Sequence, residues 1–119
     1  MKHLLLFISF LSCFMSLSAQ NGHYMRQARS YQREAEYYTK QAQIYDKEVA
    51  YYNRQAQGYL HEVEYYSKRG KYDQVRNYQR RVKDASDKAE SYKRKADCVR
   101  DKSKFYMRKA ENALQNAKK

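Results

Sequence analysis

The chain has 119 residues and carries 25 lysines and arginines against 13 aspartates and glutamates, which gives a formal net charge of +12. It contains no proline, no tryptophan and only three glycines, so it has few means of making tight turns. Apart from alanine and tyrosine, hydrophobic residues are scarce after residue 20, which excludes a thick hydrophobic core and favours long helices that meet along a narrow seam.

The first 19 residues have the layout of a secretory signal peptide. A short polar start precedes an apolar run at residues 4–14, and residues 16–19 offer small side chains for cleavage. The apolar run is shorter than the ~20 residues that a membrane-spanning helix needs. The alternatives are an uncleaved N-terminal anchor and a lipoprotein acylated at Cys13, the latter disfavoured by the bulky Phe10 and Leu11.

A tyrosine recurs at every seventh residue through the first half of the mature chain, and a column of mostly small residues follows four positions later. The tyrosine column is Tyr24, Tyr31, Tyr38, Tyr45, Tyr52, Tyr59 and Tyr66. The alanine column is Ala28, Ala35, Ala42, Val49, Ala56, Val63 and Gly70. Spacings of three and four that repeat every seven residues are typical of a helix with one continuous seam. They predict a first helix at about residues 23–68.

The seven-residue pattern breaks at Gly70 and resumes in a different phase. Glycine commonly ends helices because it tolerates a positive φ, so we expect a turn at about residues 69–72 and a second helix at about residues 73–117. One seam column of the second helix is Val75, Val82, Ala89, Ala96, Ser103, Ala110 and Ala117. The other is Tyr78, Ala85, Tyr92, Val99, Tyr106 and Ala113.

Folding the chain back at residues 70–71 brings the two seams together. In this register Tyr45 faces Ala96 and Val49 faces Tyr92, and no tyrosine faces another, so each ring is expected to meet a small or β-branched partner. The residues that flank one side of the seam are acidic or neutral in the first helix and basic in the second. The expected pairs are Glu62–Arg81, Gln55–Lys88, Glu48–Lys95, Gln41–Lys102 and Glu34–Lys109.

Both patterns select the same fold: an all-α, antiparallel two-helix coiled-coil hairpin at residues 20–119, after a cleaved signal peptide at residues 1–19. The rival arrangements are one long helix bent near Gly70 and the same pairing made between two swapped chains. Because two helices bury only a modest area, we also expect self-association or a protein partner.

Two further columns of the first helix face away from the seam and are neighbours on its surface. One is basic: Arg33, Lys40, Lys47, Arg54, His61 and Lys68. The other is mostly aromatic or apolar: Tyr37, Ile44, Tyr51, Gly58, Tyr65 and Tyr72. We call these two columns together the outer stripe. The predicted binding residues for a partner or polyanion are Arg33, Tyr37, Lys40, Lys47, Tyr51, Arg54, Tyr65 and Lys68. The alternative is a solvated basic face with tyrosines used in oligomer packing.

No catalytic, cofactor or metal site is expected. His61 has no histidine or cysteine three or four residues away, so the helical metal-ligand spacing is absent, and the sequence has no glycine-rich phosphate loop. After signal cleavage Cys98 is the single cysteine, which predicts either an intermolecular disulfide or a free thiol.

The features together predict an exported, non-enzymatic structural or interaction protein of the bacterial envelope, periplasmic or secreted. Its expected partners are a protein, a second copy or an envelope polyanion such as lipopolysaccharide or anionic lipid, rather than nucleic acid or a small-molecule substrate. A periplasmic holdase chaperone is the second hypothesis, since the chain is similar in general appearance to the basic arms of Skp-type chaperones. It lacks the strand segments by which those chaperones trimerise. A membrane-active basic helix is the third, weakened by the narrow apolar seam.

Overall fold

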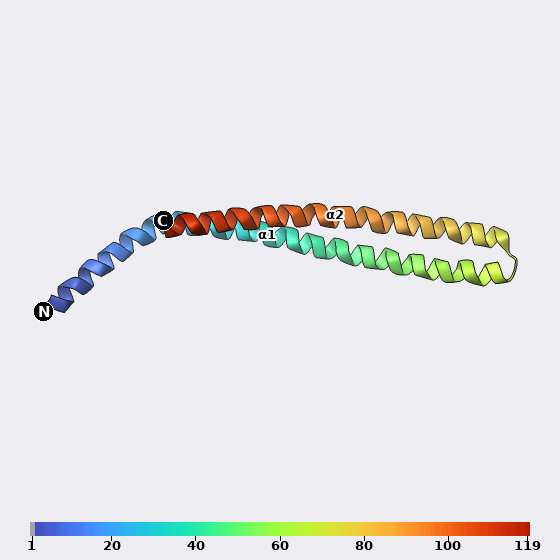
Figure 1. Ribbon diagram of the computed structural model, residues 1–119, viewed down its shortest axis with the longest axis horizontal. Helices are drawn as coiled ribbons and strands as arrows, with labels where there is room; N and C mark the ends of the chain where they lie inside the picture. The colour runs from blue at the N-terminus through green and yellow to red at the C-terminus, as the bar shows by residue number, and fades with distance from the viewer. Residues whose placement is uncertain (1) are drawn as a thin grey trace. The chain divides into compact units, whose positions relative to one another are not determined.

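The described residues form two helices joined by one turn. The computed structural model describes the backbone of residues 2–119 and the side chains of residues 21–119, so the predicted signal peptide at residues 1–19 lies outside the described side chains. Helix α1 spans Lys2–Lys68 and helix α2 spans Tyr72–Lys118 (Figure 1). The chain divides into two compact units. The terminal unit pairs Met1–Tyr37 with Lys102–Lys119, and the turn unit is Tyr38–Asp101.

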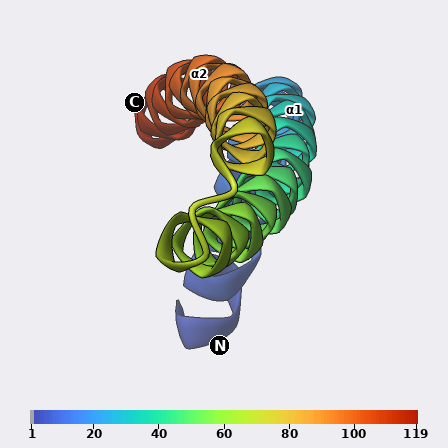
Figure 2. The ribbon, with the colours of Figure 1, turned by 90° about the vertical axis from the view of Figure 1, so that its right-hand side faces the viewer.

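Within the turn unit the two helices lie side by side and run in opposite directions, as the ribbon and its end-on view both show (Figures 1 and 2). The terminal unit is built in the same way. There the buried Ser103 hydroxyl donates a hydrogen bond of 2.9 Å to the backbone carbonyl oxygen of Ala35 across the two helices. The prediction of two long helices packed side by side in a hairpin is therefore confirmed.

The turn between the helices is a glycine-terminated helix end. The amide of Lys71 donates to the carbonyl of Tyr66 at 3.1 Å, and the amide of Gly70 donates to the carbonyl of Ser67 at 3.2 Å. This pair of hydrogen bonds is the Schellman motif. It requires a residue with left-handed backbone angles just after the C-terminal end of the helix. Gly70 is that residue, with a φ of 67°. The carbonyl of Lys71 then accepts the first bond of α2 from the Val75 amide at 3.1 Å.

Two glycine-to-alanine changes are expected to alter stability in opposite directions. Gly70→Ala places a β-carbon on a residue with a φ of 67°, and we expect it to lower the free energy of unfolding by about 1 kcal/mol. Gly58→Ala adds a methyl group inside α1 that, apart from its chain neighbours and the adjacent helix backbone, meets no atom within 4 Å, and we expect it to raise that free energy by about 0.5–1 kcal/mol. Urea unfolding followed by helical circular dichroism measures both. If Gly70→Ala were as stable as the unmodified protein, this account of the turn would be wrong.

The seam is made chiefly of small side chains that are almost completely buried. The buried seam residues are Ala28, Ala35, Ala42, Ala56, Val75, Ala85, Ala89, Ala96, Ser103, Ala110, Ala113 and Ala117. The seam tyrosines are only partly buried. Small side chains allow the helix backbones to approach closely, and a tyrosine ring is too large to fit between them. The partial burial of the rings agrees with a position at the edge of the seam.

The seam rings contact one another across the two helices between successive levels, so the expectation that each ring meets a small or β-branched partner is incomplete, although among the described residues no contact joins two tyrosines predicted to face each other. The Tyr92 ring lies between Tyr45 and Tyr52, with centroid distances of 6.0 and 5.7 Å, and is nearly parallel to Tyr52. The Tyr78 ring lies in the same way between Tyr59 and Tyr66, at 6.1 and 5.6 Å. A phenol ring reaches half a heptad along the partner helix, so it contacts rings above and below the residue that it faces.

Candidate binding surfaces

The aromatic column of the outer stripe is exposed. Tyr37 in the terminal unit is 56% exposed, and in the turn unit Ile44, Tyr51 and Tyr65 are exposed as well. Tyr72 is also exposed, but it begins α2, so its predicted place in this column of α1 is wrong. Residues seven apart on a helix lie on nearly the same face, so the side chains from Ile44 to Tyr65 form one row. Exposed apolar side chains that occur singly are normal, whereas a regular row of them makes this face a candidate contact surface.

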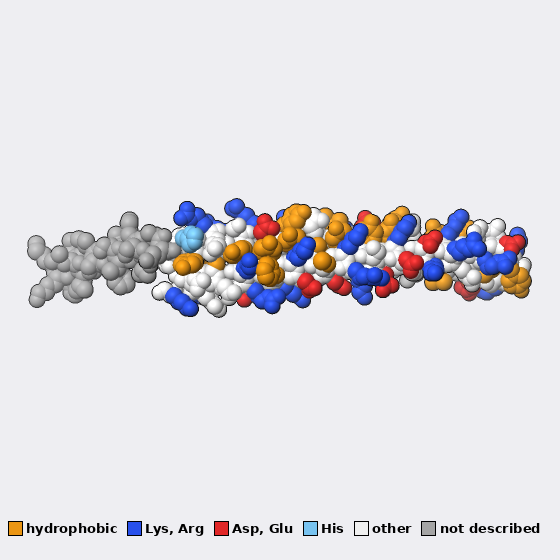
Figure 3. Space-filling view, turned by 90° about the horizontal axis from the view of Figure 1, so that it is seen from above, with side chains coloured by type: hydrophobic (Ala, Val, Ile, Leu, Met, Phe, Trp, Pro, Cys, Tyr) orange, Lys and Arg blue, Asp and Glu red, His pale blue; other side chains and the backbone are white. Residues whose placement is uncertain are grey.

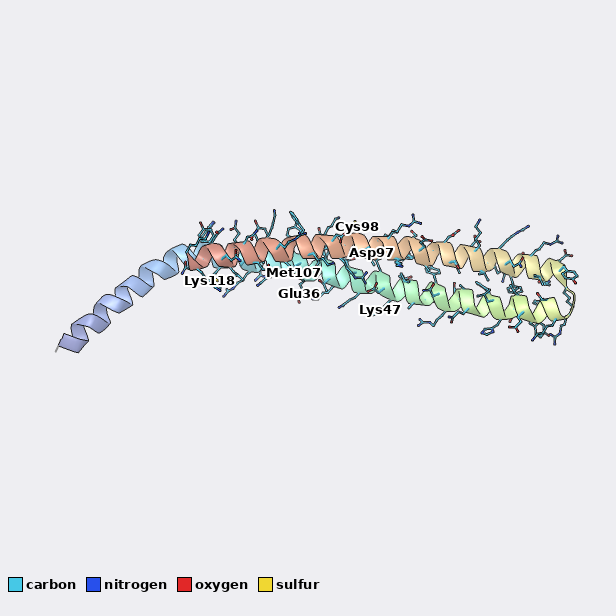
Figure 4. All side chains as sticks on the ribbon, viewed as in Figure 1. Glu36, Lys47, Asp97, Cys98, Met107 and Lys118 are labelled. Carbon is cyan, nitrogen blue, oxygen red and sulfur yellow. The ribbon has the colours of Figure 1, made fainter. Side chains whose placement is uncertain are left out.

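The basic column of the outer stripe is exposed along its whole length. Arg33 lies in the terminal unit, and Lys40, Lys47, Arg54, His61 and Lys68 lie in the turn unit. Lys47 projects from α1 on the side away from α2 (Figure 4). Neither Lys47 nor Arg54 forms an ion pair with another residue of the described part. Figure 3 views the molecule from above Figure 1, the side opposite to the one from which Lys47 projects, and there too hydrophobic side chains lie among lysines and arginines.

Two members of the outer stripe are already engaged by residues close to them in the chain. The guanidinium carbon of Arg69 lies 3.6 Å from the centroid of the Tyr65 ring, and Arg69 also donates to the Tyr65 carbonyl at 3.1 Å. The ammonium group of Lys68 lies 3.3 Å from a carboxylate oxygen of Glu64. Near the turn, two side chains of the stripe therefore already have partners within the chain. The middle section of the stripe, around Lys47, Tyr51 and Arg54, is more open.

The Tyr51 ring is held in place by two contacts. It packs edge-on against Tyr52, with a centroid distance of 5.1 Å, and its hydroxyl accepts a hydrogen bond of 2.8 Å from the Gln55 side chain. Tyr65 packs against Tyr66 in the same edge-on manner at 5.0 Å. The outer rings therefore rest on the seam rings. They have less side-chain freedom to lose on binding than isolated surface tyrosines have.

The basic residues of α2 beside the seam contact tyrosine rings. Lys88 lies 5.4 Å from the Tyr52 centroid, Lys95 lies 5.0 Å from Tyr92, and Lys109 lies 5.5 Å from Tyr31. Arg81 lies 5.1 Å from Tyr78 and 5.9 Å from Tyr59. Cations within about 6 Å of a ring centroid are attracted by the negative ring face.

These contacts replace ion pairs that the sequence predicted. Within the described residues no ion pair joins Glu62 to Arg81, Glu48 to Lys95 or Glu34 to Lys109, so the prediction for these three pairs is wrong. The half-buried rings lie within about 6 Å of these cations and attract them through their negative faces.

An ion pair between the helices occurs instead on the other side of the seam. In the turn unit Arg100 on α2 pairs with Asp46 on α1 and also donates to Asp97 at 3.2 Å. The hydrogen bond that Arg100 donates to Asp46 raises the pKa of its guanidinium above the ordinary value, and the charges of Asp46 and Asp97 add to this. Both partners are partly exposed, so this contact contributes more to the register of the helices than to stability.

The remaining sequence-predicted residue, Cys98, is exposed on α2 and pairs with no other side chain in residues 21–119 through a disulfide. In Figure 4 it projects from the helix on the side away from α1. Across residues 21–119 no group of three or more histidine, cysteine, aspartate or glutamate side chains is arranged to hold a metal ion. Over the same described residues no helical segment combines the length and apolarity needed to cross a membrane.

Comparison with protein-family models, with curated proteins and with solved structures found no match to this chain.

Proposed function

We propose that this chain is an exported, non-enzymatic coiled-coil protein of the bacterial envelope, with a signal peptide at residues 1–19 that is cleaved. In this proposal the hairpin acts as a stiff support, and the outer stripe docks a partner that carries negative charge. Envelope polyanions such as lipopolysaccharide, anionic lipid or an acidic protein surface have the required chemistry.

The observation that carries the proposal is the row of exposed rings beside exposed cations along α1. Cations attract phosphate, sulfate or carboxylate groups, and an adjacent ring adds apolar contact with the body of the same ligand. The rings of Tyr51 and Tyr65 also rest on seam rings, which reduces the entropy lost when a partner covers them.

The test is retention of the full-length protein on heparin and on lipopolysaccharide beads. A variant in which Arg33, Lys40, Lys47 and Arg54 are all replaced with glutamate is expected to elute at much lower salt. We expect the slope of log affinity against log salt to fall in magnitude by about 3–4, since each lost anion contact removes about 0.9.

The matched control reverses four exposed cations of α2 that lie outside the seam: Arg80, Lys83, Lys104 and Arg108. This control removes the same amount of positive charge. It is expected to keep most of the retention if the outer stripe is the binding surface. Equal losses in the two variants would mean that only the overall charge matters, and the proposed surface would be abandoned.

A further inference from the structure

The two helices supply seam rings at different intervals. Helix α1 has a tyrosine every seven residues, whereas the facing column of α2 alternates tyrosine with a smaller residue: Tyr78, Ala85, Tyr92 and Val99. The interval between Tyr45 and Tyr52 is filled by Tyr92, and the interval between Tyr59 and Tyr66 is filled by Tyr78. The interval between them, from Tyr52 to Tyr59, faces Ala85.

A cavity of about 200 Å³ occupies that interval. It is lined by Tyr52, Gln55, Tyr59, Arg81, Asp84, Ala85 and Lys88, and we call it the ring slot. A cavity of about 150 Å³ is large enough to admit benzene. The ring slot is therefore large enough for one aromatic ring with a small substituent.

The length of the ring slot along the hairpin also suits a ring. Seven residues of α-helix rise about 10.5 Å, and this spacing is the same in the slot as in the two filled intervals. In those intervals a phenol ring contacts the tyrosines on both sides, at centroid distances of 5.6 to 6.1 Å. The chain thus already shows twice that a ring fits between successive tyrosines of α1.

The charge around the ring slot favours an anion. Two cations, Arg81 and Lys88, line it against one carboxylate, that of Asp84. On α1 a glutamate flanks the seam beside each filled interval, Glu48 beside one and Glu62 beside the other. Beside the slot the equivalent residue is the neutral Gln55. The slot therefore lacks the α1 carboxylate that its neighbours have, and its lining is net positive.

We propose that the ring slot binds a small aromatic anion, a single planar ring that bears a carboxylate. The ring lies between Tyr52 and Tyr59 over the Ala85 methyl group, and the carboxylate meets Lys88 and Arg81 at the mouth. The slot lies beside the seam rather than on the outer stripe, so this proposal is independent of the proposed function. The sequence alone predicts no small-molecule substrate, and the slot is a binding site without catalytic groups.

Benzoate is the probe, and the readout is the Ala85 methyl resonance of the full-length protein. A ring that stacks over this methyl is expected to shift its proton resonance upfield in a saturable manner, while the exposed Ala50 methyl stays unchanged. Cyclohexanecarboxylate, which has the charge without the aromatic ring, and benzyl alcohol, which has the ring without the charge, are both expected to bind more weakly. Equal binding of cyclohexanecarboxylate, or no saturable shift with benzoate, would overturn the proposal.

Three variants sharpen the test. Ala85→Tyr supplies the missing ring from the chain itself and is expected to abolish benzoate binding while the hairpin stays folded. Because this variant has no Ala85 methyl group, its binding is followed by saturation transfer from the protein to the ring protons of benzoate, with the unmodified protein measured in the same way. Lys88→Gln is expected to weaken binding about threefold. Lys95→Gln removes a cation from a filled interval and is expected to leave binding unchanged. Retained binding in Ala85→Tyr would overturn the proposal. In the unmodified protein, an upfield shift of the Ala85 methyl that grows with protein concentration in the absence of benzoate would also overturn it, because a ring of a second copy would then occupy the slot.

Discussion

Replacing Tyr92 with alanine is expected to lower the free energy of unfolding by about 2–3 kcal/mol. The Tyr92 ring contacts Tyr45 and Tyr52 on α1, and the ammonium group of Lys95 lies 5.0 Å from its centroid. Removing a fully buried aromatic ring costs about 3–5 kcal/mol. Because Tyr92 is only partly buried, we expect a loss below that range or at its lower end. Urea unfolding at fixed protein concentration, followed by helical circular dichroism, measures the change.

Tyr72→Ala is the matched control for this prediction. Tyr72 begins α2 and is 69% exposed, so the same chemical change there is expected to alter stability by less than about 0.5 kcal/mol. If the two substitutions have equal effects, the contacts between rings contribute nothing to stability. The alanine seam would then have to hold the hairpin alone.

The hairpin could be predicted from the sequence because its two determinants are local. Apolar residues at a seven-residue period specify a seam, and the change of phase at Gly70 specifies a turn. Exposure of the outer stripe follows from the same geometry, since residues such as Tyr51 and Arg54 lie on the face opposite the seam.

The contacts of the rings could not be predicted from facing positions alone. A heptad pattern treats each level of the seam as one residue facing another, for example Val49 facing Tyr92. The Tyr92 ring instead reaches the tyrosines on either side of that level, because the alanines bring the helices too close for a ring to lie between them. The ammonium groups of Lys88 and Lys95 lie 5.4 and 5.0 Å from the centroids of two of these rings, and within the described residues neither forms an ion pair with a carboxylate of α1.

The ring slot is a consequence of combining two columns that are each regular. The tyrosine column of α1 repeats every seven residues, and the tyrosines of the facing α2 column repeat every fourteen. Neither column is unusual by itself. The interval at Ala85 can be recognised as lacking a ring only after the structure shows that the Tyr78 and Tyr92 rings fill the neighbouring intervals. The alternation of glutamate and glutamine at Glu48, Gln55 and Glu62 is the sequence signal that accompanies it.

Replacing Ala96 with leucine is expected to lower the free energy of unfolding by about 2 kcal/mol. Ala96 is 0% exposed, and as part of the alanine-rich seam it sets the distance between the helices. Extra carbon atoms at a close-packed position force neighbouring side chains or backbone to shift, at a cost of about 1–3 kcal/mol. Separation of the helices here would also loosen the nearby contacts of Tyr92 with Tyr45 and Tyr52. Urea unfolding measures the change.

Ala50→Leu is the control, because Ala50 is exposed on α1 and alanine and leucine have similar helix propensities. We expect it to change stability by less than about 0.5 kcal/mol. The comparison with Ala85→Tyr is more demanding, since that variant also enlarges a buried alanine of α2 but adds a ring where a cavity exists. Ala96→Leu should destabilise the hairpin and Ala85→Tyr should not. If both alanines tolerate enlargement equally, close approach of the helices is not what places the rings along the edge of the seam.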